Sequence, residues 1–96
     1  MTIHSIALEL EIKARGIMGF HDRPGGTIYD ANSIECGSFV DVMVMLLKVK
    51  NNFAENLEID NFADRYHSYD GKSMNEIGLE KVTAIYGEFQ ALLSAL

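Results

Sequence analysis

The sequence of 96 residues contains one cysteine, Cys36, together with a single proline and no tryptophan. A lone cysteine can form neither an intramolecular disulfide nor a cysteine-based zinc site. The first residues, MTIHSIALELEIK, lack the basic segment and apolar block of a secretory signal, and no apolar run is long enough to cross a bilayer. These absences predict a protein of a reducing compartment, the cytoplasm, without a membrane partner.

Basic residues are also scarce. Eight lysines and arginines stand against fourteen acidic residues, which gives a formal charge of −6. This is the wrong sign for holding a phosphate backbone, so we expect no direct binding to nucleic acid. Residues 49–96 carry eight acids and four bases, so the negative field is concentrated in the C-terminal half. Such a field attracts a basic partner and speeds its encounter.

The chain has no repeat, no linker and no low-complexity tract, so residues 1–96 are expected to form one globular domain. A domain of this size buries only about two-thirds of the surface that its unfolded chain exposes. A deep substrate pocket would compete with that small core for side chains. We therefore expect no enzyme, no catalytic residue and no cofactor.

The C-terminal stretch has the clearest helical pattern. Ser73 and Glu76 have the spacing of a capping box, in which each side chain binds a free N–H at the start of a helix. Seven apolar side chains then fall on one helical face: Met74, Val82, Ile85, Phe89, Leu92, Leu93 and Leu96. The pattern predicts one helix over residues 73–95.

Two further helices are predicted in the middle of the chain. Residues 38–52 are apolar around most of a helical circumference, which indicates a buried central helix with Ser38 and Asp41 as its capping pair. Valines lower helix propensity there, but the run is too long for a typical strand. Residues 57–67 carry a narrower apolar stripe and predict a short amphipathic helix.

Two patterns fit the N-terminal residues. Ile6, Leu8, Leu10 and Ile12 alternate with more polar residues, as in a half-buried strand. Apolar residues also line one helical face, at positions Ile3, Ile6, Ala7, Leu10, Ala14 and Ile17. Helix propensities favour a helix that ends near Gly16. The alternative is a hairpin of residues 5–20 and 26–30.

Together these elements predict a mainly α fold, a small single-domain bundle of three or four helices around residues 38–52. If the hairpin forms instead, the fold is α+β, with an N-terminal β-hairpin packed on helices.

The segment HDRPGG, residues 21–26, is the densest cluster of reactive side chain types. His21 is a possible general base and Arg23 a possible anion ligand. Proline and glycine are, however, the ordinary residues of turns, and the surroundings of a phosphate-binding loop are missing. We interpret the segment as a turn.

A second cluster is Asp60, Asp64 and His67. On a helix these side chains project within roughly a 60° arc, so they have the spacing to reach one divalent cation. Acidic residues four apart are common on solvated helix faces, and no second helix is known to supply further ligands. We therefore predict no metal site.

An acidic surface with interleaved tyrosines is the strongest candidate for partner binding. Its predicted members are Glu55, Glu58, Asp60, Asp64, Tyr66, Tyr69 and Asp70. Tyrosine provides a large contact area at low conformational cost, and the carboxylates suit a partner rich in lysine or arginine. The competing interpretation places Tyr66 in the core and makes Asp70 part of a turn.

Small side chains form a strip on the last predicted helix, at Ala84, Gly87, Ala91 and Ala95. A glycine inside a helix costs about 1 kcal/mol relative to alanine, so Gly87 suggests a packing reason. The strip allows another helix to come close. We expect that helix to belong to the same chain; the alternative is a homodimer through Ala84, Gly87 and Ala91.

These features favour a non-catalytic protein-binding module with a basic protein partner. An immunity protein or antitoxin that neutralises a basic toxin or nuclease is the concrete form of this hypothesis. A nuclease site attracts phosphate, and a compact acidic surface can occupy the same field. A homo-oligomeric structural or regulatory subunit is the first alternative, and a small metal-dependent enzyme is the second.

Overall fold

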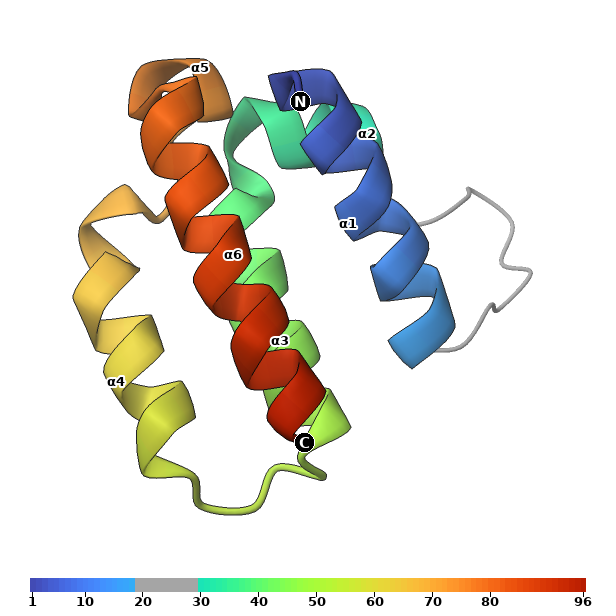
Figure 1. The fold of residues 1–96 in the computed structure, drawn as a ribbon, viewed down its shortest axis with the longest axis vertical. Coiled ribbons are helices and arrows are strands. Elements are labelled where there is room, and N and C mark those ends of the chain that lie inside the picture. The colour runs from blue at the N-terminus through green and yellow to red at the C-terminus, as the bar shows by residue number, and fades with distance from the viewer. Residues whose placement is uncertain (19–29) are drawn as a thin grey trace.

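The computed structural model describes residues 1–18 and 30–96, which are helical almost throughout (Figure 1). In chain order the elements are α1 (Ile3–Met18), α2 (Ala31–Ser33), the π-helical turn η1 (Ile34–Ser38), α3 (Phe39–Lys50), α4 (Leu57–Tyr66), the 3-10 turn η2 (His67–Tyr69), α5 (Met74–Ile77) and α6 (Leu79–Ala95). These described ranges contain no strand. The prediction of a small, mainly α domain is confirmed.

α3 is the central helix. It packs against α1, α4 and α6, and Figure 1 shows α6 lying across it with α1 and α4 to either side. Its buried residues are Phe39, Val40, Val42, Met43, Leu46 and Leu47. A helix that is apolar around most of its circumference must be covered from several directions, which explains why the other long helices surround it.

The N-terminal segment forms the helix α1, so the predicted helix is confirmed and the hairpin is wrong over residues 5–18. Leu8 and Ile12 distinguish the helix from the strand. A half-buried strand would bury both side chains, yet they are 40% and 69% exposed. The helical stripe of Ile6, Ala7 and Leu10 is buried instead. Residues 26–29 of the proposed hairpin lie outside the described residues.

The single helix predicted for residues 73–95 is wrong at Gly78. The Ser73 Oγ accepts a hydrogen bond of 3.1 Å from the Glu76 N–H, as the capping pattern indicates. The short α5 nevertheless ends at Ile77, because Gly78 has φ 94° and ψ 145°. Glycine tolerates this left-handed backbone. The break lets α5 pack against η1, where Met74 is fully buried, while α6 follows its own direction across α3.

The residues before α3 form a helical segment that the sequence patterns did not predict. The Asp30 Oδ1 begins it by accepting a 2.8 Å hydrogen bond from the Ser33 N–H. Gly37, with φ 152°, then bends the chain before α3. A Cβ placed on Gly37 would lie only 2.9 Å from the Gly71 carbonyl oxygen, so this backbone contact requires glycine.

The capping pair predicted for the start of α3 is wrong. Ser38 makes no side-chain capping hydrogen bond, and its φ of −107° and ψ of 11° are not the extended values of a capping residue. Ser38 is the last residue of the turn η1, so no extended residue precedes α3. The other member of the pair, Asp41, approaches Asp70.

Candidate partner-binding surface

α4 presents most of the acidic residues predicted to bind a partner. The Asn56 Oδ1 caps the helix by accepting hydrogen bonds from the N–H groups of Glu58 and Ile59, at 3.0 and 3.2 Å. Ile59 and Phe62 are buried against the core. This anchoring leaves four predicted carboxylates exposed: Glu55, Glu58, Asp60 and Asp64.

These four carboxylates form no ion pair with any residue in the ranges 1–18 and 30–96. The one basic residue of α4, Arg65, is bound to Glu88 on α6. Glu58 and Asp60 also lie in the first turn of α4, where their charges interact favourably with the helix dipole. α4 and the two residues before it therefore present to solvent a negative charge that no described basic residue balances. The four carboxylates are called the α4 acidic surface below.

The two tyrosines of the predicted surface turn inward. Tyr66 and Tyr69 are half-buried and pack against the core. The Tyr66 hydroxyl donates a hydrogen bond of 2.5 Å to the Glu88 carboxylate, and its ring contacts Phe62 edge-on. The Arg65 guanidinium lies 5.6 Å from the centre of the Tyr66 ring. Tyr66 thus links α4 to α6 within the chain.

Asp70 lies away from the α4 acidic surface. It follows η2 and approaches Asp41, at the start of α3. Partial burial raises the pKa of Asp41, and the hydrogen bond and charge of Asp70 raise this pKa further. The structure therefore does not bring all seven predicted residues into one surface.

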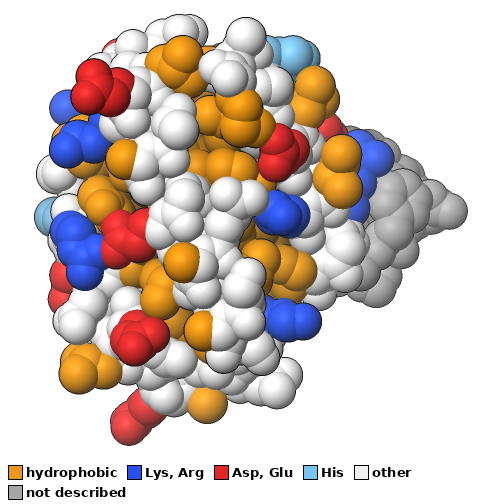
Figure 2. All heavy atoms as spheres, in the orientation of Figure 1, with side chains coloured by type: hydrophobic (Ala, Val, Ile, Leu, Met, Phe, Trp, Pro, Cys, Tyr) orange, Lys and Arg blue, Asp and Glu red, His pale blue; other side chains and the backbone are white. Residues whose placement is uncertain are grey.

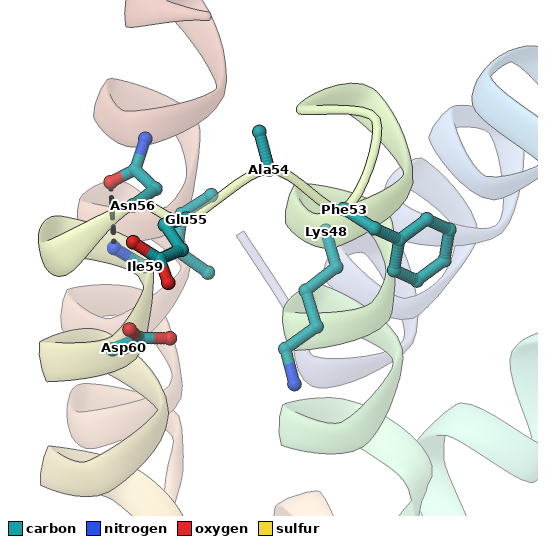
Figure 3. Close-up of a pocket in the computed structure, with 7 residues that line it drawn as sticks. All are labelled: Lys48, Phe53, Ala54, Glu55, Asn56, Ile59 and Asp60. Carbon is teal, nitrogen blue, oxygen red and sulfur yellow. Dashed lines mark hydrogen bonds between the residues drawn. The ribbon is translucent and has the colours of Figure 1, made fainter.

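A hollow lies between the end of α3 and the start of α4 (Figure 3). It has a volume of about 260 Å³ and is lined by Lys48, Phe53, Ala54, Glu55, Asn56, Ile59 and Asp60. Figure 3 shows Lys48 extending from α3 into the space between the helices and Asp60 pointing into that space from α4. Lys48 forms no ion pair with Glu55, Asp60 or any other described residue. With two carboxylates and one ammonium, the hollow has a net charge of −1.

Phe53 is a surface residue that the sequence patterns did not identify. Its N–H donates to the Lys48 carbonyl at 2.8 Å, and the Asn52 N–H donates to the Val49 carbonyl at 3.0 Å. This is the Schellman arrangement that closes a helix C-terminus. Both residues are left-handed, with φ of 55° for Asn52 and 57° for Phe53. Asparagine tolerates that conformation, whereas it is unusual for a bulky aromatic residue.

Phe53 is 69% exposed, although the apolar residue at this position of a Schellman arrangement often packs on its own helix. Figure 3 shows the ring pointing away from α4. Leu57, at the start of α4, is 74% exposed. The signal in the sequence was an aromatic residue directly after two asparagines that end an apolar helix.

The other predicted sites have different outcomes. The segment HDRPGG lies outside the described residues, so the structure does not place His21 or Arg23. Within the described chain, no group of three or more histidine, cysteine, aspartate or glutamate side chains could hold a metal ion, and this includes the trio of Asp60, Asp64 and His67. No helix in the described ranges is long and apolar enough to cross a membrane.

The strip of small residues on α6 faces solvent, so the expectation that another helix of the same chain covers it is wrong for the described part of the chain. Ala84, Gly87, Ala91 and Ala95 are all exposed. A Cβ placed on Gly87 would meet nothing within 4 Å. In Figure 2 the charged side chains lie to either side of α6, whose outer surface is largely uncharged.

Comparisons with protein-family models, with curated proteins and with solved structures found no match for this chain.

Proposed function

We propose that this protein is a non-catalytic binding module of the cytoplasm whose α4 acidic surface neutralises a basic protein partner. An immunity protein or antitoxin that blocks a toxic nuclease is its most concrete form. One observation carries the proposal: Glu55, Glu58, Asp60 and Asp64 are exposed and form no ion pair among the described residues.

The physical argument rests on the field of these carboxylates. An uncompensated cluster of one sign attracts a partner of the opposite sign and raises the association rate, by about 10-fold or more at low ionic strength. A nuclease is such a partner, because its active site is built to attract phosphate. A folded acidic helix competes with phosphate for the positive field of that active site, and it needs no catalytic residue to do so.

The test uses two double variants with the same change of charge. Asp60→Lys with Asp64→Lys reverses two charges of the α4 acidic surface, and Glu76→Lys with Glu80→Lys reverses two on α5 and α6. Each variant changes the formal charge from −6 to −2. Tagged proteins are used to capture partners from native cytosol at low and high salt, and captured proteins are identified by mass spectrometry.

We expect one stoichiometric basic protein that is retained by wild type, released by high salt and lost from the Asp60 and Asp64 variant only. Affinity for the purified partner should fall about 10-fold or more in that variant. Charges at the rim of an interface act mainly on the association rate constant, and the reversed charges would lower it. Equal affinity of the two double variants would show that the surface is wrong. A partner that binds wild type equally well at low and high salt would count against the electrostatic mechanism.

A homo-oligomeric subunit is the second candidate, favoured by the exposure of Ala84, Gly87 and Ala91. Small residues let a second helix approach closely, and an uncharged outer face lets two copies of an acidic protein meet with little repulsion. Sedimentation of wild type and of Gly87→Leu with Ala91→Leu tests this candidate. It predicts a wild-type dimer and a monomeric variant, so a monomeric wild type would exclude it.

A further inference from the structure

The end of the molecule formed by residues 48–60 combines three features that no other described part of it shares. It has the hollow between α3 and α4, with Glu55 and Asp60 in its lining. It has an aromatic residue, Phe53, which lies beside this hollow and is 69% exposed. It has a second large apolar side chain, Leu57, which is 74% exposed four residues further on.

The charge of the hollow identifies the kind of side chain that it accepts. Glu55 and Asp60 are both without an ion pair, and Lys48 opposes them without binding either. A cationic side chain that enters from outside finds two carboxylates, whereas an anionic one meets net repulsion. The volume of about 260 Å³ is just below the usual range for ligand pockets, so the hollow suits one side chain rather than a whole metabolite.

The position of Phe53 identifies a second contact. The left-handed backbone of Asn52 and Phe53 holds the ring outward, where it makes no ring contact with another described aromatic residue. Aromatic residues, phenylalanine included, are enriched at protein interfaces relative to the rest of the surface. The ring offers an apolar face, and its π-system also favours a nearby cation.

We infer that this end is a two-part docking site for a basic protein segment, whose lysine or arginine enters the hollow beside Glu55 and Asp60 while a neighbouring apolar side chain packs on Phe53. This inference rests on the proposed function and names the part of the surface that recognises the partner. Lys48 occupies part of the space that the incoming cation needs and repels it. Removal of the Lys48 ammonium therefore strengthens binding.

The probe is a displayed library of random 12-residue peptides, selected on the immobilised wild-type protein. The enriched peptides are synthesised, and their dissociation constants are measured by calorimetry at low and high salt. We expect the enriched sequences to carry a lysine or arginine within about four residues of a large apolar residue, because both halves of the site must be filled together.

Matched variants locate the binding. Phe53→Gly removes the ring and suits the left-handed backbone at φ 57°, so it deletes the contact without straining the chain. Asn52→Gly makes the same backbone change one residue earlier and keeps the ring. We expect the dissociation constant of the peptide to rise about 5-fold for Phe53→Gly, because an aromatic contact is lost. For Asn52→Gly we expect it to change by less than about 2-fold.

The charges of the hollow are tested in the same way. Glu55→Lys and Asp60→Lys should each weaken the peptide about 10-fold, since they replace attraction by repulsion. Lys48→Ala should strengthen it about 3-fold, and Lys50→Ala, at an exposed lysine that does not line the hollow, should change it less. Circular dichroism and thermal unfolding verify that every variant is folded.

The outcomes separate this inference from the proposed function. Basic, salt-sensitive peptides that respond to Asp64→Lys but not to Phe53→Gly or Glu55→Lys would overturn the docking site and leave the acidic-surface proposal standing. Enriched peptides without basic residues, or no enrichment at all, would overturn the docking site, while the capture experiment with the two double variants decides the acidic-surface proposal. Weaker binding for Lys48→Ala would also overturn the docking site, because it would make Lys48 a contact rather than a competitor.

Discussion

α4 and α6 both pack on α3 with an inner face of the same kind, yet their outer faces differ. Each inner face carries a fully buried phenylalanine, Phe62 on α4 and Phe89 on α6. The outer face of α4 carries Asp60 and Asp64, whereas the exposed residues of α6 after Lys81 are Thr83, Ala84, Gly87, Gln90, Ala91, Ser94 and Ala95. Folding requires the inner faces and leaves the outer faces free. The outer faces are therefore the surfaces that remain available for binding.

The largest expected effect tests whether the inner faces are equivalent. Phe62→Ala and Phe89→Ala each remove a fully buried ring, so each should lower the free energy of unfolding by about 3–5 kcal/mol. Small domains are stable by only about 5–15 kcal/mol, so both variants should be severely destabilised. Urea denaturation followed by circular dichroism measures both. A cost below about 1 kcal/mol for either ring would show that its helix is not part of the cooperative core.

A smaller effect is expected at the contact that joins the two helices. Glu88→Ala removes the partner of both Arg65 and the Tyr66 hydroxyl, and should cost about 1–2 kcal/mol, since the groups are partly exposed and the ion pair is screened. Tyr66→Phe removes only the hydrogen bond and should cost about half as much. Hydrogen exchange should show faster exchange of α4 amides than of α6 amides in the Glu88 variant. Equal exchange in both helices would contradict the link.

Substitutions on the outer faces should stabilise the chain. Gly87→Ala places a methyl group where nothing lies within 4 Å and raises helix propensity, so the free energy of unfolding should increase by about 0.5–1 kcal/mol. Asn61→Ala, on the exposed side of α4, should increase it by about 0.5 kcal/mol for the same reason. Thermal unfolding of dilute protein measures both. Destabilisation by Gly87→Ala would show that the α6 face is packed against something.

The smallest effect concerns Asp70, the predicted surface residue that lies at Asp41 instead. The pKa of Asp41 is raised from its ordinary 3.8 by burial and by Asp70. Above this raised pKa both carboxylates are charged and repel each other in the folded chain, and as the pH falls through it Asp41 takes up a proton and the repulsion ends. Asp70→Asn should therefore stabilise the protein at pH 7, by about 0.5 kcal/mol after solvent screening.

That gain should shrink as the pH falls through the raised pKa of Asp41 and should be lost well below the ordinary value of 3.8, where Asp41 is protonated in both the folded and the unfolded chain. Thermal unfolding of wild type and Asp70→Asn between pH 3 and 7 measures the difference. A gain that stays constant over this range would contradict the pairing of the two carboxylates.

Helical periodicity was sufficient to locate the four long helices found in residues 1–18 and 30–96. The stripe of Ile6, Ala7 and Leu10 predicted α1 even though an alternating pattern competed with it, because the residues of this segment are mostly good helix formers. The same reasoning failed at Gly78, where one periodic pattern covers two helices. Periodicity indicates which residues face the core. It does not reveal a change of helix direction after which the same residues still face the core.

The candidate surface was predicted in part. Charge and exposure follow from residue type for Glu55, Glu58, Asp60 and Asp64, since ionised carboxylates are rarely buried. The environment of a tyrosine does not follow from its type, and Tyr66 is held by a glutamate 22 residues away in the chain. Phe53 shows the opposite case, because aromatic residues are usually well buried, yet this one has a left-handed backbone and is exposed.

The sequence by itself determined the helical class, the buried stripes and the negative charge, because each depends on residue type and on spacing within one turn or two. Only the tertiary structure decided which outer faces remain uncovered, that Asp41 meets Asp70, and that Lys48 opposes Glu55 and Asp60 in one hollow. These are contacts between helices. They depend on the positions and angles at which whole helices cross. The spacing of apolar residues within one helix does not specify these positions and angles.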